Sequence, residues 1–564
     1  MEVIRKHYNS FLGIVTVFFS VIAYLFILLT INKGTSCDEG YYLLSYLPNQ
    51  PIHWGISQFE FIVRKIFWFL PEDNALILRY VRYFINIFSL AFFAFSSHKW
   101  LKKKYAVEFS PFQYYSLIFL SGVLSFGFAS PILYYDNLQL FIYLLTFSLY
   151  FLHSTSDSLF QKILFLVISG LLMIFGVFNY LPSGLLLITA ITFLLILEKK
   201  QVQNIFYLLL GLFFGLIIYH FLISDIHQTI RDIQSSFFTA QQGTTKHDNR
   251  HLILAVVKYL MEFAVFFLLF LVFGSLLGLT HKIKGIRLKY FIYALFTLII
   301  LGIVLQQGLF SKYYTDFFTI PVAMVFAYII LEKHNKNTIK ISLKEILTFS
   351  LFLFIPLMGI FGTNQNLSAK MLFFMPFWVV AFYLLIAFSK TKENLFIKVS
   401  STVYVLLLIT GFAYLVYFNR FHYYYTPKKS NIEIENDVRF QHIKVSQWQK
   451  DFNEKAIRIL NENGFKKGDK ILAFYDNFIT VYIAGGYIPK DLIYQFEVFA
   501  TDIKNIPDKP VDYILIIEEQ EKPMMEFLKK TGWEFPEKYQ RFDLGKAAEN
   551  LPAGYNSILF IKKK

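Results

Sequence analysis

The sequence predicts an α-helical membrane protein with many spans, followed by a small α/β domain. Of its 564 residues 56% are hydrophobic and only 16% are charged, whereas soluble proteins carry about 25% charged residues. Apolar runs of nearly 20 residues recur along the chain, and about 20 residues of helix cross the hydrocarbon core of a bilayer. The composition becomes polar after about residue 424, which indicates a separate unit at the C-terminal end.

We expect thirteen membrane-spanning helices, each of them a run that is almost without charge. Their approximate ranges are 11–31, 75–97, 113–130, 137–153, 161–178, 183–197, 204–223, 252–279, 289–308, 316–331, 345–362, 371–388 and 398–417.

The connections between these helices alternate in charge. Five of the six connections after even-numbered spans are rich in Lys and Arg, among them HKWLKKK and HKIKGIRLK, whereas connections after odd-numbered spans, such as PILYYDN, are poor in both. Basic loops stay in the cytoplasm. The N-terminus should therefore be cytoplasmic and, with an odd number of spans, the C-terminal segment extracytoplasmic. The same rule accounts for most of the net charge of +15, so no nucleic-acid partner is needed to explain it.

Two of the predicted outer loops are long. Residues 32–74 include QFEFIVRKIFWFL, an amphipathic stretch that would lie flat in the membrane interface as a helix. Residues 224–251 mix polar, basic and glycine residues. That composition suits a mobile flap over a site, and it equally suits a disordered loop.

The segment 424–564 reads as a soluble α/β domain. WQKDFNEKAIRILNENG predicts a helix that ends at Gly464, and PMMEFLKKTG predicts another that ends at Gly532. KILAFYD, VDYILIIEE and NSILFIKK predict strands. The segment has no GxGxxG, Walker or metal-ligand motif, so we expect it to recognise or position a substrate. The single cysteine, Cys37, excludes an intrachain disulfide framework.

Three acidic residues are candidates for chemistry. Asp38 and Glu39 follow the first span by about seven residues, which holds them near the membrane surface. A carboxylate there could accept a proton from an attacking hydroxyl or amine, or help to bind a divalent cation through its oxygens; the alternative is an ordinary solvated loop. Asp136 lies in the short connection between the third and fourth spans. It could serve the same site, cap the fourth helix, or do both.

Several Lys, Arg and Tyr residues lie on the predicted outer side, where the positive-inside rule leads us to expect few Lys and Arg residues. Together they would suit the phosphate or pyrophosphate of a lipid. For Lys258 the alternative is an ordinary ion pair with Glu262, one turn later, in which the Lys258 amine reaches outward. The candidates are Tyr41, Arg79, Arg82, Arg250, Lys258, Lys312, Tyr313 and Tyr314.

In their order and sidedness these motifs resemble the C-type glycosyltransferase (GT-C) superfamily. The resemblance is to the aminoarabinose-transferase and RgtA/B/C/D-like branch, with protein O-mannosyltransferases more distant. It is carried by CDEGYY in the first outer loop, LRYVRYFINIF in the next span, YYDNLQL and KYYTDFFTIP. Two features depart from the pattern: Pro51 stands where a double proline is usual, and the WWDYG-like signature of oligosaccharyltransferases does not occur.

The resemblance implies a GT-C-like fold in a bacterial cell (inner) membrane. It also implies a polyprenyl-phosphate sugar donor and an acceptor lipid, glycan or protein at the outer face. Asp38 would then be the base, assisted by Glu39 or Asp136, while Lys312, an arginine of the second span and a tyrosine bind the donor phosphate. A divalent metal would be compatible with the acids, and the sequence alone does not require one.

Two other classes of protein remain alternatives. A lipid-linked sugar flippase or transporter needs ionisable groups near the middle of the membrane, where only Lys258 and Glu262 come close. A surface-polysaccharide polymerase or ligase more often places its chemistry in one large outer loop late in the chain. Here the acidic motifs come early.

Overall fold

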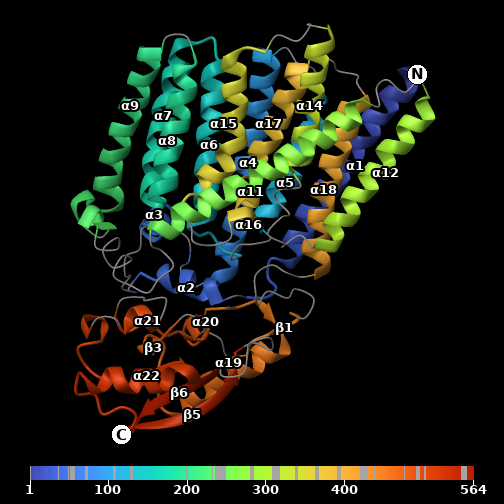
Figure 1. The fold of residues 1–564 in the computed structure, drawn as a ribbon. Helices are drawn as coiled ribbons and strands as arrows, with labels where there is room; N and C mark the ends of the chain where they lie inside the picture. Colours follow the sequence, from blue (N-terminus) through green and yellow to red (C-terminus); the bar gives the residue numbers. More distant parts are fainter. Residues whose placement is uncertain are drawn as a thin grey trace.

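The computed structural model describes most of the chain. It covers residues 2–35, 37–48, 50, 57–69, 71, 74–105, 109–126, 131–198, 201–231, 233–234, 249–279, 285–307, 318–336, 341–362, 367–389, 395–418, 430–435, 439–474, 477–490, 496–500, 503–547 and 555–563. These residues form a helical bundle, with a small sheet near the C-terminal end of the chain (Figure 1).

The bundle is built from helices of very different length. The helices before residue 240 are α1 (Glu2–Thr30), α2 (Cys37–Ser45), α3 (Phe59–Ile66), α4 (Ala75–Tyr105), α5 (Pro111–Val123), α6 (Tyr135–Thr155), α7 (Leu159–Asn179), α8 (Leu181–Ile196) and α9 (Gln201–Ile218). The later ones are α11 (Asn249–Leu279), α12 (Ile286–Gln307), α14 (Thr319–Lys336), α15 (Leu343–Gly359), α16 (Leu367–Met371), α17 (Met375–Ser389) and α18 (Leu395–Phe418).

Over its described residues, each of the expected spans overlaps a helix or consecutive helices. Among the described residues, five helices are long and apolar enough to cross a membrane. The count of thirteen spans therefore stays a prediction, while the class of membrane protein is supported. The five are Phe11–Thr30, Ala75–Tyr105, Tyr135–Thr155, Leu159–Asn179 and Gln201–Ile223.

Small residues allow close contact between α7 and α9. A Cβ atom on Gly170 would lie 2.5 Å from the carbonyl oxygen of Leu208. A Cβ atom on Gly211 would lie 2.2 Å from the carbonyl oxygen of Val167. Small residues at helix contacts are a common feature of membrane bundles, where packing rather than hydrophobic burial draws helices together.

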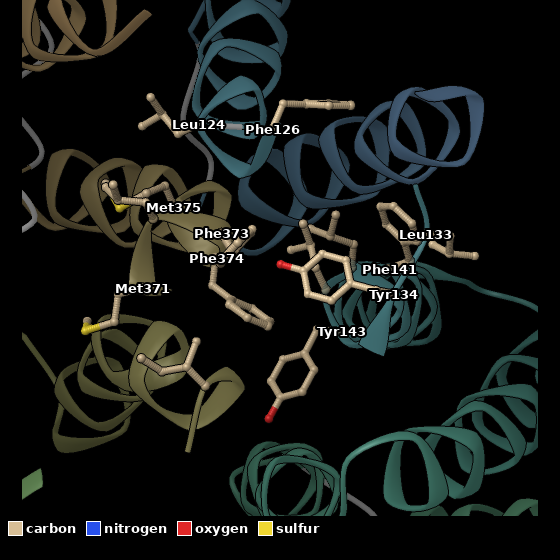
Figure 2. Packing of buried hydrophobic residues seen from close by; sticks show 14 of the residues in the cluster. Leu124, Phe126, Leu133, Tyr134, Phe141, Tyr143, Met371, Phe373, Phe374 and Met375 are labelled. Atoms are coloured by element: carbon tan, nitrogen blue, oxygen red, sulfur yellow. The ribbon is translucent and has the colours of Figure 1, made fainter. Parts of the chain in front are cut away.

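Aromatic side chains fill the interior of the bundle. Figure 2 shows Tyr143, in α6, close to Phe374, which lies in the short helical segment between α16 and α17. The ring centroids of Tyr143 and Phe374 are 5.2 Å apart in an edge-to-face arrangement, which is a favourable geometry for two aromatic rings. This packing holds the middle of α6 against the segment between α16 and α17.

The C-terminal segment folds as an α/β unit. A four-stranded sheet has the order β3-β4-β6-β5 (Ile471–Ala473, Tyr513–Ile517, Asn556–Lys562, Tyr539–Lys546). Only β3 and β4 are parallel. The helices are α19 (Gln447–Glu462), α20 (Phe478–Ile483), α21 (Phe496–Phe499) and α22 (Glu518–Lys529), and β1 (Ile432–Glu433) pairs with β2 (Lys444–Val445). As expected, Gly464 and Gly532 follow helices with positive φ, which a glycine adopts without strain.

This α/β unit packs directly on the segment after α1 and on α2, the helix that holds Asp38 and Glu39 (Figure 1). The backbone N–H of Gly34 donates to the carbonyl oxygen of Lys444 at 2.7 Å, and the Lys444 N–H donates to Asn32 at 2.7 Å. Helix α20 lies on α2 so closely that a Cβ atom on Gly40 would be 2.3 Å from the backbone nitrogen of Ile479. We call this end of the bundle the outer end, after the side that the charge pattern predicts.

Candidate functional site

The two adjacent acids open helix α2 at the outer end. They lie in its first turn, where carboxylates interact favourably with the positive end of the helix dipole. Neighbouring residues of a helix point about 100° apart, and the two side chains have different surroundings. Asp38 is half-buried, whereas Glu39 is completely buried.

Glu39 forms a buried ion pair with Arg79. The Nε and Nη2 atoms of Arg79 donate to the two carboxylate oxygens of Glu39 at 2.8 and 2.7 Å. The same guanidinium donates to the carbonyl oxygens of Ile31 and Gly34 at 2.8 and 2.7 Å. The hydroxyl of Thr35 donates to Glu39 at 2.8 Å. This network joins the end of α1, the start of α2 and the first turns of α4.

The buried ion pair indicates a different role for Glu39 and Arg79 from the one that the sequence patterns suggested. Sequence patterns suggested a catalytic acid and a phosphate ligand, but both side chains are fully buried and bonded to each other. Buried charges are tolerated when paired and hydrogen-bonded. The geometry therefore favours a role in holding α2 in place.

Asp136 is paired with a lysine that the sequence patterns did not reveal. The Nζ atom of Lys370, on α16, donates to Oδ2 of Asp136 at 2.8 Å and to the hydroxyl of Tyr135 at 3.3 Å. Both side chains of the ion pair are about 5% exposed. The N-cap of α6 is Tyr134, so Asp136 is not the capping residue that the alternative interpretation expected.

Several of the charged side chains at this site shift the pKa of one buried tyrosine, Tyr134. Burial raises the pKa of the Tyr134 hydroxyl well above its ordinary value, and the Asp136 and Asp38 carboxylates raise it further. The guanidinium of Arg82 has the opposite effect on this pKa. Arg82 is buried, donates to the carbonyl oxygen of Ser125 at 3.1 Å, and lies 4.5 Å from the ring centre of Phe126. Asp38, Asp136 and Arg82 are thus near one tyrosine.

Aromatic rings surround this group of charges. The ring centroids of Tyr42 and Tyr134 are 5.1 Å apart, and those of Tyr135 and Tyr180 are 5.6 Å apart. Tyr41 contacts Tyr42 at 5.4 Å and reaches Phe478 of the C-terminal unit at 6.1 Å. Phe59 and Tyr46 also belong to this aromatic cluster. The cluster joins α2, α3, α6 and the α7–α8 turn.

A third buried carboxylate lies in the same layer. Glu60, on α3, is 3% exposed, and its Oε2 atom makes no hydrogen bond to the described residues. Burial raises the pKa of Glu60 to about 8, although its own backbone N–H and Arg64 partly oppose the shift. The sequence patterns did not single out Glu60 as a candidate. The available signal was a lone acid in the amphipathic stretch QFEFIVRKIF.

The remaining predicted residues are not brought together with the acids. Lys312, Tyr313 and Tyr314 lie outside the described residues. Arg250 is the second residue of α11, and the Lys258 side chain is exposed on the same helix. Their assignment as substrate ligands stays a prediction.

The described residues do not fit a tightly held divalent metal. Nowhere in the described ranges do three His, Cys, Asp or Glu side chains gather as a metal-ligand group. In addition, the ammonium of Lys370 already contacts one oxygen of Asp136. Hard divalent cations require several oxygen ligands, and a neighbouring ammonium would repel them.

Comparison with known proteins yields only distant similarities. No protein-family model matches the chain, and no curated protein does. The solved structures with similarity include an Archaeoglobus fulgidus oligosaccharyltransferase in complex with Zn and sulfate (TM-score 0.45, 12% identity), covering 92% of this chain and 69% of that one. Its apo form gives a TM-score of 0.46 at 10% identity, covering 93% and 71%. The form tethered to an acceptor peptide with the NVT sequon gives 0.44 at 11%, covering 95% and 72%. Because these TM-scores are below 0.5, we base the following proposal on the outer-end geometry and the sequence motifs.

Proposed function

We propose that this protein is a membrane glycosyltransferase. It would transfer a sugar from a polyprenyl-phosphate donor to a lipid, glycan or protein acceptor at the outer face of the membrane. The observation that carries the proposal is that Asp38 and Asp136 both act electrostatically on the buried Tyr134, while α20 of the C-terminal unit packs on α2, the helix that Asp38 opens. Residues that are nearly 100 positions apart in sequence thus form one acidic centre at the end of the bundle.

The chemistry needs a base and a stabilised leaving group. In an inverting displacement the acceptor oxygen or nitrogen attacks C1 of the sugar and gives up its proton, while the bond from C1 to the phosphate oxygen breaks. Asp38 is the base in this proposal, because it combines partial exposure with a place in the acidic centre. A positioned base of this kind contributes about 10²–10⁴-fold to the rate.

The location of the charges favours transfer over transport. The buried pairs Glu39–Arg79 and Asp136–Lys370 lie at the outer end of the bundle rather than along its length. An acceptor arriving from water could reach this layer. We assign the C-terminal unit to acceptor positioning, because α20 lies on α2, the helix whose first turn holds Asp38. Lys312, Tyr313 and Tyr314 remain proposed ligands of the donor phosphate.

The test compares two isosteric changes in purified protein reconstituted with a lipid-linked sugar donor. Asp38→Asn keeps the shape of the side chain and removes its basicity, so sugar transfer should fall by about 10²–10⁴-fold. Donor binding should persist. The exposed Asp451→Asn in α19 serves as a matched control and should leave transfer unchanged. Near-normal transfer by the Asp38 variant would remove the catalytic assignment.

A further inference from the structure

Lys370 places a fixed positive charge inside the candidate site. Its side chain is 6% exposed and comes from α16, more than 200 positions away in sequence from its partner Asp136. Burying an ammonium is costly unless it is paired, so the protein keeps this cation by pairing it with one carboxylate. A single oxygen of Asp136 at 2.8 Å meets that need.

The ammonium retains capacity for a further acceptor. A lysine carries three N–H donors. Asp136 and the hydroxyl of Tyr135 accept from Lys370, and the third N–H has no acceptor among the described residues. A substrate oxygen close to Asp136 and Tyr135 could take this position.

From this geometry we infer that Lys370 binds the phosphate of the lipid-linked donor and stabilises it as it leaves. This inference rests on the proposed function and identifies how its leaving group is handled. When the bond from C1 to the phosphate oxygen breaks, the electron pair stays on that oxygen. The N–H of Lys370 donates a hydrogen bond to the departing phosphate, and the acceptor's proton goes to Asp38.

The side chains around Asp136 suit a cationic residue better than a metal ion at this position. The ammonium on Asp136 makes this carboxylate a poor metal ligand, and no three-ligand group of His, Cys, Asp or Glu is present in the described part of the chain. A preformed cation aimed at developing negative charge needs no reorganisation during the reaction. Sugar transfer should therefore survive removal of divalent metals.

The experiment measures two quantities on the purified full-length protein in EDTA: binding of a polyprenyl phosphate that carries no sugar, and sugar transfer. The wild type should bind and transfer. Lys370→Ala should weaken polyprenyl-phosphate binding and reduce transfer by about 10²–10³-fold, the usual effect of losing one preorganised donor. Lys370→Arg, which keeps the charge, should restore part of both. Adding Mg²⁺ or Mn²⁺ should raise transfer by Lys370→Ala, because the vacated carboxylate can then take a metal, and should not raise transfer by the wild type.

Lys103→Ala is the matched control. It removes another lysine–aspartate pair, Lys103–Asp157 at 2.7 Å, in which both side chains are exposed. It should leave binding and transfer unchanged. If the alanine variant of Lys370 does not fold, the arginine variant and Lys370→Gln are compared at equal thermal stability.

The outcomes separate the two proposals. A wild type that does not bind polyprenyl phosphate, or an Asp38→Asn variant with full transfer, overturns the proposed function. If the wild type binds polyprenyl phosphate and transfers sugar without EDTA, but loses transfer in EDTA, the inference about Lys370 is overturned. Unchanged polyprenyl-phosphate binding by a folded Lys370→Ala variant does the same.

Discussion

Replacing Glu60 with glutamine should make the stability of the protein less dependent on pH. The Glu60 carboxyl is buried in the outer-end layer, and one of its oxygens has no hydrogen-bond partner among the described residues. Burial raises its pKa from 4.5 to about 8. Between these two values the folded protein holds a proton that the unfolded chain releases.

The sign and size of the effect follow from this difference in proton binding. Because the folded state binds more protons, the free energy of unfolding falls as the pH rises through this window. The stabilising contribution is complete below pH 4.5 and is lost as the pH rises through about 8. A pKa difference of this size corresponds to roughly 5 kcal/mol over the whole window. Glutamine has the same shape and stays neutral, so Glu60→Gln should remove this loss.

The assay is thermal unfolding in detergent, followed by tryptophan fluorescence from about pH 5 to about pH 9. The two proteins should unfold at similar temperatures at the acidic end. The glutamine variant should become progressively more stable than the wild type toward the alkaline end. Glu526→Gln, an exposed position on α22, should follow the wild-type curve. Parallel curves for Glu60→Gln and the wild type would show that Glu60 is not held protonated by burial.

Three further predictions address other parts of the structure. Glu39→Gln should lower the free energy of unfolding by about 3–5 kcal/mol, because it leaves the buried Arg79 guanidinium without its counter-charge; chemical unfolding in detergent measures this, and a change below about 1 kcal/mol would contradict the structural role. Gly40→Ala should separate α2 from α20, since the new Cβ would lie 2.3 Å from the Ile479 backbone nitrogen; hydrogen exchange should accelerate in α20 but not in β4, and equal protection would refute the close contact. A reporter active only in the cytoplasm should be silent when fused at the C-terminus, whereas strong activity would mean that the predicted orientation is reversed.

Helix positions could be predicted from the sequence because they depend on local composition. The expected span 161–178 is almost entirely apolar after Lys162, and the corresponding helix α7 (Leu159–Asn179) begins and ends close to the expected bounds. Short outer elements were harder to predict. Helix α16 has only five residues, too few to show a period, and all but its last residue lie in the connection before the expected span 371–388. Its lysine was overlooked for the same reason.

The candidate site was only partly predictable because its partners are distant in sequence. The charge alternation placed Asp38, Glu39 and Asp136 on one side of the membrane, and the structure brings them to one end of the bundle. The pairing of Asp136 with Lys370 depends on how α6 and α16 pack, which no local pattern records. A useful signal was present: Lys370 is a basic residue in an outer connection that otherwise lacks Lys and Arg.

The buried carboxylates of the outer end show why adjacent acids have different roles. An ionised carboxylate inside a membrane protein must be paired or neutralised. Glu39 and Asp136 are paired, with Arg79 and Lys370 respectively, and Glu60 is neutralised because its pKa rises to about 8. Glu39 and Asp136 are therefore engaged in ion pairs, and Glu60 holds its proton into the neutral range. Asp38, one residue from Glu39, differs because it remains partly exposed at the edge of the same layer. A base must exchange its proton with an incoming acceptor, so of these four acids Asp38 is the one whose surroundings suit that step.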